Sequence, residues 1–243
     1  MIKSDNISNN KKHTTDPIYK SDNRNATATP DARLENRKLR LAILGAGGIA
    51  RKMAETINRM EEVELYAVAS RTEEKARQFA DTYHASKWYG SYEEMVADNG
   101  IDLVYVATPH SHHKEHTMLC LNHNRAVLCE KAFAVNTKEA EDMIRLAKEK
   151  NILLAEAMWV RYMPMSFTLK EIIDSDVIGK ITGLTANLGY SLMQVERLIR
   201  PELAGGALLD LAPYTLNFAT WVLGDNVSTI HTTMTPHETG VDK

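Results

Sequence analysis

The chain has 243 residues, 44% of them hydrophobic and 25% charged, which is the composition of an ordinary globular protein rather than of a fibrous or disulfide-rich one. Its 29 Lys and Arg residues against 32 Asp and Glu give a net charge of −3, so the basic surplus that a nucleic-acid-binding protein needs is missing. No apolar run approaches the roughly 18 residues that span a bilayer and no signal peptide is recognised, so we expect a cytoplasmic protein with no membrane or nucleic-acid partner.

The first 38 residues differ in composition from the rest of the chain. They contain six large apolar residues among many Asn, Ser, Thr, Asp and Lys. So few apolar side chains bury too little surface to offset the entropy lost on ordering. We therefore expect a disordered tail over residues 1–38.

From residue 39 onward, short apolar runs alternate with stretches of helical period, which is typical of βα units on a parallel sheet. We expect strands at 39–44, 63–70, 101–107, 126–129 and 152–155. Helices are expected after the first strand, then up to about residue 83, and at 113–122 and 137–150. The first of these helices carries Ile49, Met53 and Ile57 on one apolar face, and Asn136 is placed to cap the last. These units predict a doubly wound Rossmann domain over residues 39–157.

A differently built domain is expected over residues 158–243. Helical patterns cover about 166–173 and 207–223. Residues 181–192 alternate between apolar and polar, and 227–234 are rich in β-forming residues, so each segment predicts a strand. The fold class is therefore α/β, a parallel sheet followed by an α+β domain with an open, mostly antiparallel sheet.

The sharpest local motif is a GxGxxA sequence between the first strand and the first helix. Gly45 permits the tight turn, and Gly47 lets backbone amides approach a pyrophosphate at the positive helix N-terminus. The small Ala50 allows close packing of helix on strand, and Gly48 and Ile49 complete the motif. In this βαβ context the motif predicts a dinucleotide site.

The residues after the second strand discriminate between NADP and NAD. An acidic residue there would bind a ribose 2′-hydroxyl, and a cation would bind a 2′-phosphate. The chain has Ser70 and Arg71 at this point and Lys75 one turn later, so NADP is favoured over NAD. The alternative is that both cations only flank a solvated helix start.

Polar side chains follow the third and fourth strands, at the sheet edge where α/β proteins bind ligands. After the third strand come Thr108, Pro109, His110 and His113, within a group of four His residues. No HExxH motif, Cys ligand or spaced carboxylate completes a metal site, so we expect contacts to the cofactor and no metal. The two cysteines, at 120 and 129, are expected to be buried thiols.

Two further segments carry candidate catalytic groups. Glu130 and Lys131 end the fourth strand and are both expected to contact the cofactor; the lysine would also serve the chemistry, and its alternative is an ordinary surface residue. Asp210 and Tyr214 are four residues apart and share a helix face, and Pro213 places them near a helix start. The alternative for Tyr214 is a core aromatic residue.

These motifs together resemble the Gfo/Idh/MocA family over residues 39–243. They are GAGGIA at 45–50, TPHSHH at 108–113, CEK at 129–131, AMWVRYMP at 157–164 and GGALLDLAPY at 205–214. Within the family, AVASR, YGSYEE and HETGVD are most similar to the branch of dimeric dihydrodiol dehydrogenases and NADP-dependent D-xylose 1-dehydrogenases.

The resemblance implies NADP-dependent hydride transfer to or from a hydroxyl-bearing carbon of a sugar or cyclic diol. Tyr214 would exchange the hydroxyl proton, with Asp210 supporting it, and Lys131 would hold the substrate and favour the phenolate of Tyr214. From their position just after the last strand of the Rossmann domain, Trp159 and Arg161 are expected to line the substrate site; the alternative is a structural aromatic residue and a surface cation. The family's proline after Glu-Lys is Ala132 here, which removes a fixed φ beside the lysine.

Family members continue through several more strands after HETGVD, so the resemblance implies a C-terminally truncated substrate and dimerisation domain at 158–243. A homodimer is possible although its usual sheet would be mostly missing. Two alternatives stay open, a non-catalytic NADP-binding remnant or regulatory module and an NAD-linked polyol dehydrogenase of the same family.

Overall fold

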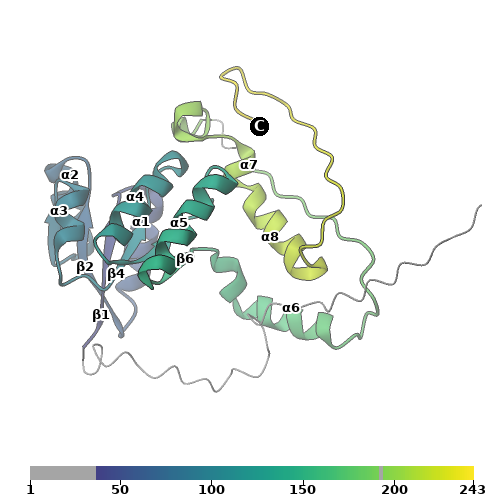
Figure 1. Cartoon of the computed structure of the whole chain (residues 1–243), viewed down its shortest axis with the longest axis horizontal. Coiled ribbons are helices and arrows are strands. Elements are labelled where there is room, and N and C mark those ends of the chain that lie inside the picture. Colours follow the sequence, from purple (N-terminus) through teal and green to yellow (C-terminus); the bar gives the residue numbers. More distant parts are fainter. Residues whose placement is uncertain (1–36, 192–193) are drawn as a thin grey trace, which may run out of the picture. The chain divides into compact units, whose positions relative to one another are not determined.

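The computed structural model describes residues 37–191 and 194–243, and its centre is a parallel sheet of six strands (Figure 1). The strands are β1 (Leu39–Leu44), β2 (Val63–Ala69), β3 (Lys87–Tyr89), β4 (Leu103–Val106), β5 (Ala126–Cys129) and β6 (Leu154–Glu156). Their order in the sheet is β3-β2-β1-β4-β5-β6. The order reverses between β1 and β4, so the carboxyl ends of these two strands form the switch point where such sheets bind ligands.

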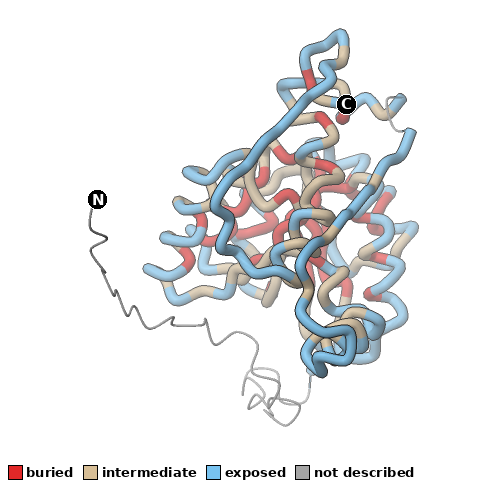
Figure 2. The backbone as a smooth tube through the Cα atoms, turned by 90° about the vertical axis from the view of Figure 1, so that its right-hand side faces the viewer, coloured by how far each residue is buried: buried red, intermediate tan, exposed pale blue. Residues whose placement is uncertain are grey.

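Five helices connect the strands: α1 (Gly48–Ile57), α2 (Glu73–Tyr83), α3 (Tyr92–Ala97), α4 (His113–Asn122) and α5 (Thr137–Lys150). Side chains of α1 and α2 pack on one face of the sheet, and those of α3, α4 and α5 pack on the other. The buried stretches of backbone in Figure 2 gather in this sheet and its helices. The buried sheet and the helices on both of its faces confirm the predicted Rossmann architecture.

The predicted elements of this region are largely confirmed. The helices at 113–122 and 137–150 match to the residue, and the Asn136 side chain accepts a hydrogen bond from the Glu139 amide at 3.0 Å. Short β3 and α3 were not expected, because three strand residues and six helix residues carry too little periodicity.

The predicted buried face of α1 needs a correction. Ala50, Ala54 and Ile57 are its buried residues, whereas Ile49 is 42% exposed and Met53 is only partly buried. Small side chains let the helix approach the sheet closely, so the alanines take the inner face although Ile is more hydrophobic. Ile49 then lies at the edge of a cavity described below.

The later part of the chain contains helices α6 (Pro164–Asp174), α7 (Ala207–Asp210) and α8 (Ala212–Leu223). Short 3-10 turns occur at His110–His112, Trp159–Tyr162, Glu196–Leu198 and Pro201–Leu203. The expected helical region 207–223 is thus two helices, and Pro213 lies in the first turn of α8 as predicted.

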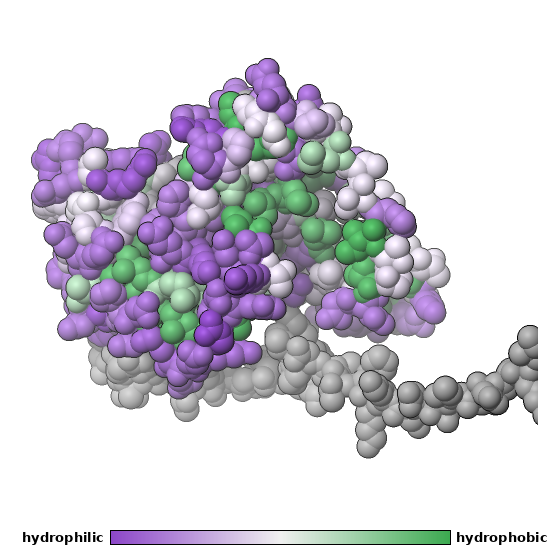
Figure 3. All heavy atoms as spheres, turned by 45° about the horizontal axis from the view of Figure 1, so that its top comes forward, coloured by the Kyte–Doolittle hydropathy of each residue, from purple (hydrophilic) through white to green (hydrophobic). Residues whose placement is uncertain are grey.

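The strands expected at 181–192 and 227–234 are a wrong prediction. The described residues of both segments pair with no strand, and the one bridge in this region joins Pro236 to Asp242. Alternation identifies a chain able to line a sheet, but a strand exists only where a neighbour supplies hydrogen bonds. Residues 227–234 are exposed, and so are 181–191 except for the partly buried Ile181, Leu184 and Leu188. Hydrophobic side chains lie open on the face drawn in Figure 3, and Tyr190 and Ile230 are among the exposed apolar residues.

The disordered tail predicted for residues 1–38 lies outside the described residues except for its last two. Both cysteines are buried free thiols, as expected. Across residues 37–191 and 194–243, no helix is both long and apolar enough to cross a bilayer.

Candidate functional site

Two neighbouring cavities open at the carboxyl edge of the sheet. The Lys131 cavity, of about 450 Å³, is lined by Gly47, Gly48, Ile49, Ala107, Thr108, Pro109, His110, Glu130, Lys131, Trp159, Tyr190, Arg197, Asp210, Leu211 and Tyr214. The Arg71 cavity, of about 630 Å³, is lined by Gly45, Ala46, Gly47, Ser70, Arg71, Lys75, Tyr92, Ala107, Thr108, Pro109, His112, Glu115, His116, Glu196, Arg197, Arg200 and Leu203. Most of the predicted site residues therefore gather around one continuous edge of the sheet.

The glycine motif forms the turn from β1 into α1. Gly45 has φ +104° and its amide donates to the Ala69 carbonyl at 3.0 Å, so the turn is tied to the end of β2. A Cβ atom at Gly45 would lie 2.9 Å from Thr108 Cγ2, whereas one at Gly48 would meet nothing within 4 Å. The N-terminus of α1 thus faces open space and has no side-chain cap, which leaves its amides and positive dipole end available to an anion.

The Arg71 cavity carries the cations expected for a phosphate. Arg71 and Lys75 both line it, next to the buried Ser70 at the end of β2. Arg197 and Arg200 line it from the later part of the chain. Four cations against the carboxylates of Glu115 and Glu196 favour an anionic occupant.

Lys131, Asp210 and Arg197 form a partly buried ionic cluster in the Lys131 cavity. The Lys131 ammonium donates to the Asp210 carbonyl oxygen at 2.7 Å and to its Oδ1 at 3.2 Å. Arg197 Nη2 donates to the same Oδ1 at 3.0 Å. Burial raises the pKa of Asp210, but the charges of Lys131 and Arg197 outweigh it and hold that pKa below its ordinary value. Asp210 is therefore a carboxylate that fixes both cations.

Tyr214 lies beside this cluster on α8. The Lys131 ammonium stands 5.1 Å from the centre of the Tyr214 ring, and the Trp159 indole N–H donates to the Tyr214 hydroxyl at 3.4 Å. Burial raises the pKa of Tyr214, although the Trp159 hydrogen bond lowers it in part. The net direction is therefore toward the phenol, opposite to the phenolate expected beside Lys131, and burial is its largest cause.

Glu130 is a buried carboxyl group on the wall of the Lys131 cavity. It accepts hydrogen bonds from the Tyr105 hydroxyl and, at 3.1 Å, from the Lys131 amide. Burial raises the pKa of Glu130 despite these two bonds. Its contacts hold the backbone at Lys131, and so help to aim that side chain.

The two histidines after β4 that were expected to contact the cofactor, His110 and His113, have different surroundings. His110 lines the Lys131 cavity, donates from Nδ1 to the Ala204 carbonyl at 3.1 Å, and has its pKa lowered by burial to about 4. His113 was expected to contact the cofactor, but it lines neither cavity. Its ring nitrogens lie 2.7 Å from the Ala132 carbonyl and 2.9 Å from the Thr108 carbonyl, so it ties two loops together. Among the described residues no metal-binding group of three His, Cys, Asp or Glu side chains is found.

The two expected substrate residues separate. Trp159 lines the Lys131 cavity, but Arg161 lines neither cavity and donates from Nε to Asn217 on α8 at 2.9 Å. Sequence reasoning missed Arg197 and Arg200, which sit in a segment with no motif of its own. The signal available was only their position just before the Gly205–Gly206 turn.

Comparison with known families matches two models to this chain. Residues 39–158 match a model described as an oxidoreductase family with an NAD-binding Rossmann fold. Residues 167–243 match the model of the GFO/IDH/MocA C-terminal domain. Together the two matches include every residue that lines the two cavities except Trp159.

The relatives include two curated enzymes and a solved structure. The D-xylose 1-dehydrogenase (NADP⁺) of Hypocrea jecorina is 41% identical in an alignment of 206 residues that covers 76% of this chain and 52% of that protein. The trans-1,2-dihydrobenzene-1,2-diol dehydrogenase of Xenopus tropicalis is 34% identical over 204 residues, 83% of this chain and 62% of that protein. A 3-ketoreductase from Actinomadura kijaniata, solved with NADP and TDP-benzene, superposes with a TM-score of 0.69 at 25% identity over 77% of this chain and 58% of its own. The chain thus spans about half to three fifths of these relatives.

Proposed function

Because the chain belongs to the Gfo/Idh/MocA family of oxidoreductases, we propose that it is an NADP-dependent dehydrogenase acting on a hydroxyl group of a sugar or cyclic diol. The observation that carries the proposal is that Lys131 and Tyr214 line the same cavity as the open N-terminus of α1. A nicotinamide dinucleotide bound there supplies the hydride acceptor or donor. Residues 39–157 would bind it and residues 158–243 would contribute the substrate side.

The protein groups then have distinct tasks. The Tyr214 hydroxyl exchanges a proton with the substrate oxygen, and the Lys131 ammonium donates a hydrogen bond to that oxygen. Because burial raises its pKa, Tyr214 is a phenol at neutral pH and is ready to donate when a carbonyl is reduced. Oxidation of an alcohol needs the phenolate, so the rate of oxidation should rise with pH through the neutral range.

The choice of NADP rests on the Arg71 cavity. Arg71 and Lys75 line it where an adenosine 2′-phosphate would lie, and Ser70 stands where NAD enzymes have a carboxylate. The Hypocrea relative is named as an NADP⁺ enzyme. An NAD-linked polyol dehydrogenase would leave both cations without a ligand.

We also propose a cytoplasmic location, on the sequence alone. We propose a homodimer on the exposed apolar side chains of α8 and of residues 227–234. Leu216, Leu223, Val227 and Ile230 supply a surface that a second copy would cover. Size-exclusion chromatography coupled to light scattering measures the oligomeric state directly.

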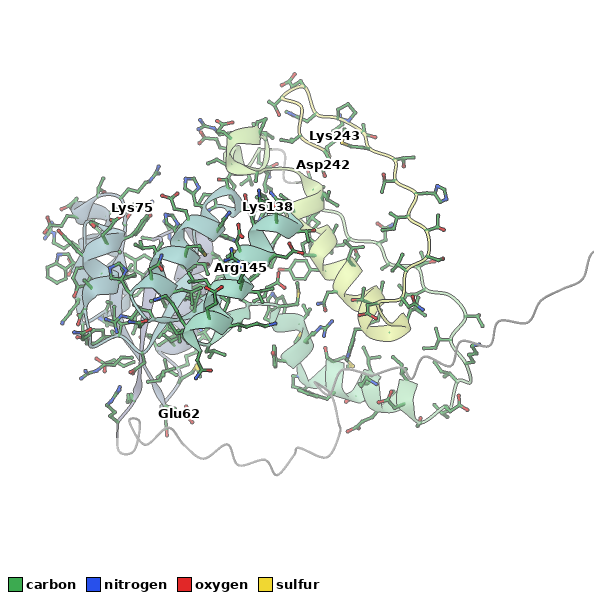
Figure 4. All side chains as sticks on the ribbon, in the orientation of Figure 1. Glu62, Lys75, Lys138, Arg145, Asp242 and Lys243 are labelled. Atoms are coloured by element: carbon green, nitrogen blue, oxygen red, sulfur yellow. The ribbon has the colours of Figure 1, made fainter. Side chains whose placement is uncertain are left out.

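The test is a fluorescence titration of the full chain with NADPH and with NADH, followed by turnover assays. We expect NADPH to bind at least about tenfold more tightly, which is about 1.4 kcal/mol. The R71M variant should lose that preference, while R145M, a change of an exposed arginine on α5 (Figure 4), should keep it. Turnover of D-xylose or of a dihydrodiol with NADP⁺ would support the dehydrogenase activity itself. Binding without turnover of any aldose or diol would instead indicate a non-catalytic NADP-binding module, and no binding at all would refute the proposal.

A further inference from the structure

Arg197 is placed where the two cavities meet. Five residues line both cavities: Gly47, Ala107, Thr108, Pro109 and Arg197. Of these five, only Arg197 carries a charge. It comes from the 3-10 turn Glu196–Leu198 in the later part of the chain, far in sequence from the glycine motif at 45–50.

The guanidinium of Arg197 is only partly used. One nitrogen, Nη2, donates to Asp210 Oδ1 at 3.0 Å. A guanidinium has five N–H donors, and those of Nε and Nη1 have no hydrogen-bond partner within the described part of the chain. The side chain is 45% exposed, so these donors are accessible from the cavities.

A dinucleotide across both cavities imposes a requirement on their junction. With the nicotinamide half near Lys131 and the adenosine half near Arg71, the pyrophosphate that joins the two halves must cross where the cavities meet. It brings negative charge to that point. The α1 N-terminus beside Gly47 supplies backbone amides there, and a rigid guanidinium is well suited to phosphate oxygens.

We infer that Arg197 binds the cofactor's pyrophosphate through its remaining N–H donors while its Nη2 stays bound to Asp210. This inference rests on the proposed dinucleotide-binding function. Arg197 thereby clamps the dinucleotide between the α1 N-terminus and the later part of the chain. Because Asp210 Oδ1 also accepts from Lys131, the same carboxylate sets the position of the cofactor clamp and of the substrate-binding ammonium.

The experiment compares R197M with R145M by titrating each full-length variant with NADPH and NADH. Arg145 is the matched control, because its Nη2 also donates to an aspartate Oδ1, that of Asp142 at 2.8 Å, on α5 and outside both cavities (Figure 4). Both nucleotides contain the pyrophosphate, so R197M should weaken both by about tenfold. R71M, by contrast, should weaken NADPH alone.

A second readout separates phosphate binding from a merely structural role. Added NaCl screens ionic contacts, so the affinity of the unaltered protein should fall with salt, and that of R197M should fall less steeply. If R197M does not fold, R197K serves instead, because a single ammonium cannot contact Asp210 and a phosphate with the reach of the guanidinium fork. We expect R197K to weaken both nucleotides severalfold.

The outcomes distinguish this inference from the function on which it depends. One outcome is that the unaltered chain binds NADPH while R197M or R197K binds each nucleotide as tightly as the unaltered chain does. In that case Arg197 does not contact the pyrophosphate, and the dehydrogenase proposal stands. An unchanged salt dependence in R197M, or a loss confined to NADPH, also overturns the inference. If the unaltered chain binds neither nucleotide, both proposals fail together.

Discussion

Replacing Asp210 by Asn tests whether one buried carboxylate holds Lys131 and Arg197 together. Its Oδ1 lies 3.2 Å from Lys131 Nζ and 3.0 Å from Arg197 Nη2, and the residue is 5% exposed. Asn keeps the shape of the side chain but removes its charge, which leaves two cations close to each other without an anion. The carbonyl oxygen of residue 210 still accepts from Lys131, so the loss is partial.

The magnitude follows from the exposure of the two partners. A hydrogen bond to a charged group contributes about 1.5–3 kcal/mol, and the Lys131 side chain is only 12% exposed, so its bond counts nearly in full. The Arg197 side chain is 45% exposed, where solvent reduces an ion pair to about 0–1 kcal/mol. We therefore expect D210N to lower the free energy of unfolding by about 2–3 kcal/mol at pH 7, measured by urea denaturation followed by circular dichroism.

The dependence of this loss on pH has a definite sign. The pKa of Asp210 is held below its ordinary value of 3.8, so the unfolded chain takes up the proton at a higher pH than the folded one. The stabilisation is complete above the unfolded pKa and is lost as pH falls through the folded pKa. Asn cannot titrate, so the difference between the two proteins should shrink as the pH is lowered below about 4.

The matched control is D142N. Asp142 also holds a lysine and an arginine, Lys114 and Arg145, each at 2.8 Å, but these pairs lie at the surface. D142N should therefore lose less stability than D210N. Equal losses in the two variants, or no loss in D210N at pH 7, would refute the reasoning from burial.

Three further predictions concern the site and the core. Y214F removes the hydroxyl that exchanges a proton, so kcat in steady-state assays should fall by about 10²–10⁴-fold while NADPH affinity is unchanged; full turnover would exclude Tyr214 as the acid. G45A puts a Cβ at φ +104° and 2.9 Å from Thr108 Cγ2, so both the melting temperature and NADPH affinity should drop, and an unchanged melting temperature would contradict the strain argument. Burial raises the pKa of Cys120 and of Cys129 to about 12, so neither thiol should react with Ellman's reagent at pH 8 until urea is added; rapid labelling of the folded chain would show that the sheet opens easily.

The first half of the fold was predictable because its signals are local. Apolar runs of four to seven residues, the glycine turn at Gly45 and the Asn136 cap each depend on residues close together in the chain. The same is true of the site residues that end strands, since the carboxyl ends of parallel strands meet at one edge. Thus Ser70, Thr108 and Lys131 were brought to one edge, as the motifs predicted.

Tertiary contacts decided what those motifs do chemically. No local pattern joins Arg197 to Asp210 and Lys131, because the three come from segments up to 79 residues apart. The direction of the Tyr214 pKa likewise depends on burial, which raises it, and on contacts such as the Trp159 hydrogen bond, which lowers it only in part. Burial and charge in a site are properties of its complete surroundings, which single motifs do not contain.

By itself, the sequence determined most of the strands and helices of residues 39–157, the glycine turn and the identity of the candidate catalytic groups, because each depends on residues close together in the chain. Only the tertiary structure decided that residues 181–191 and 227–234 remain unpaired and that His113 supports loops instead of lining a cavity. A strand needs a partner and a side chain needs a direction. Both are supplied by residues distant in the chain, so neither can be deduced from local periodicity.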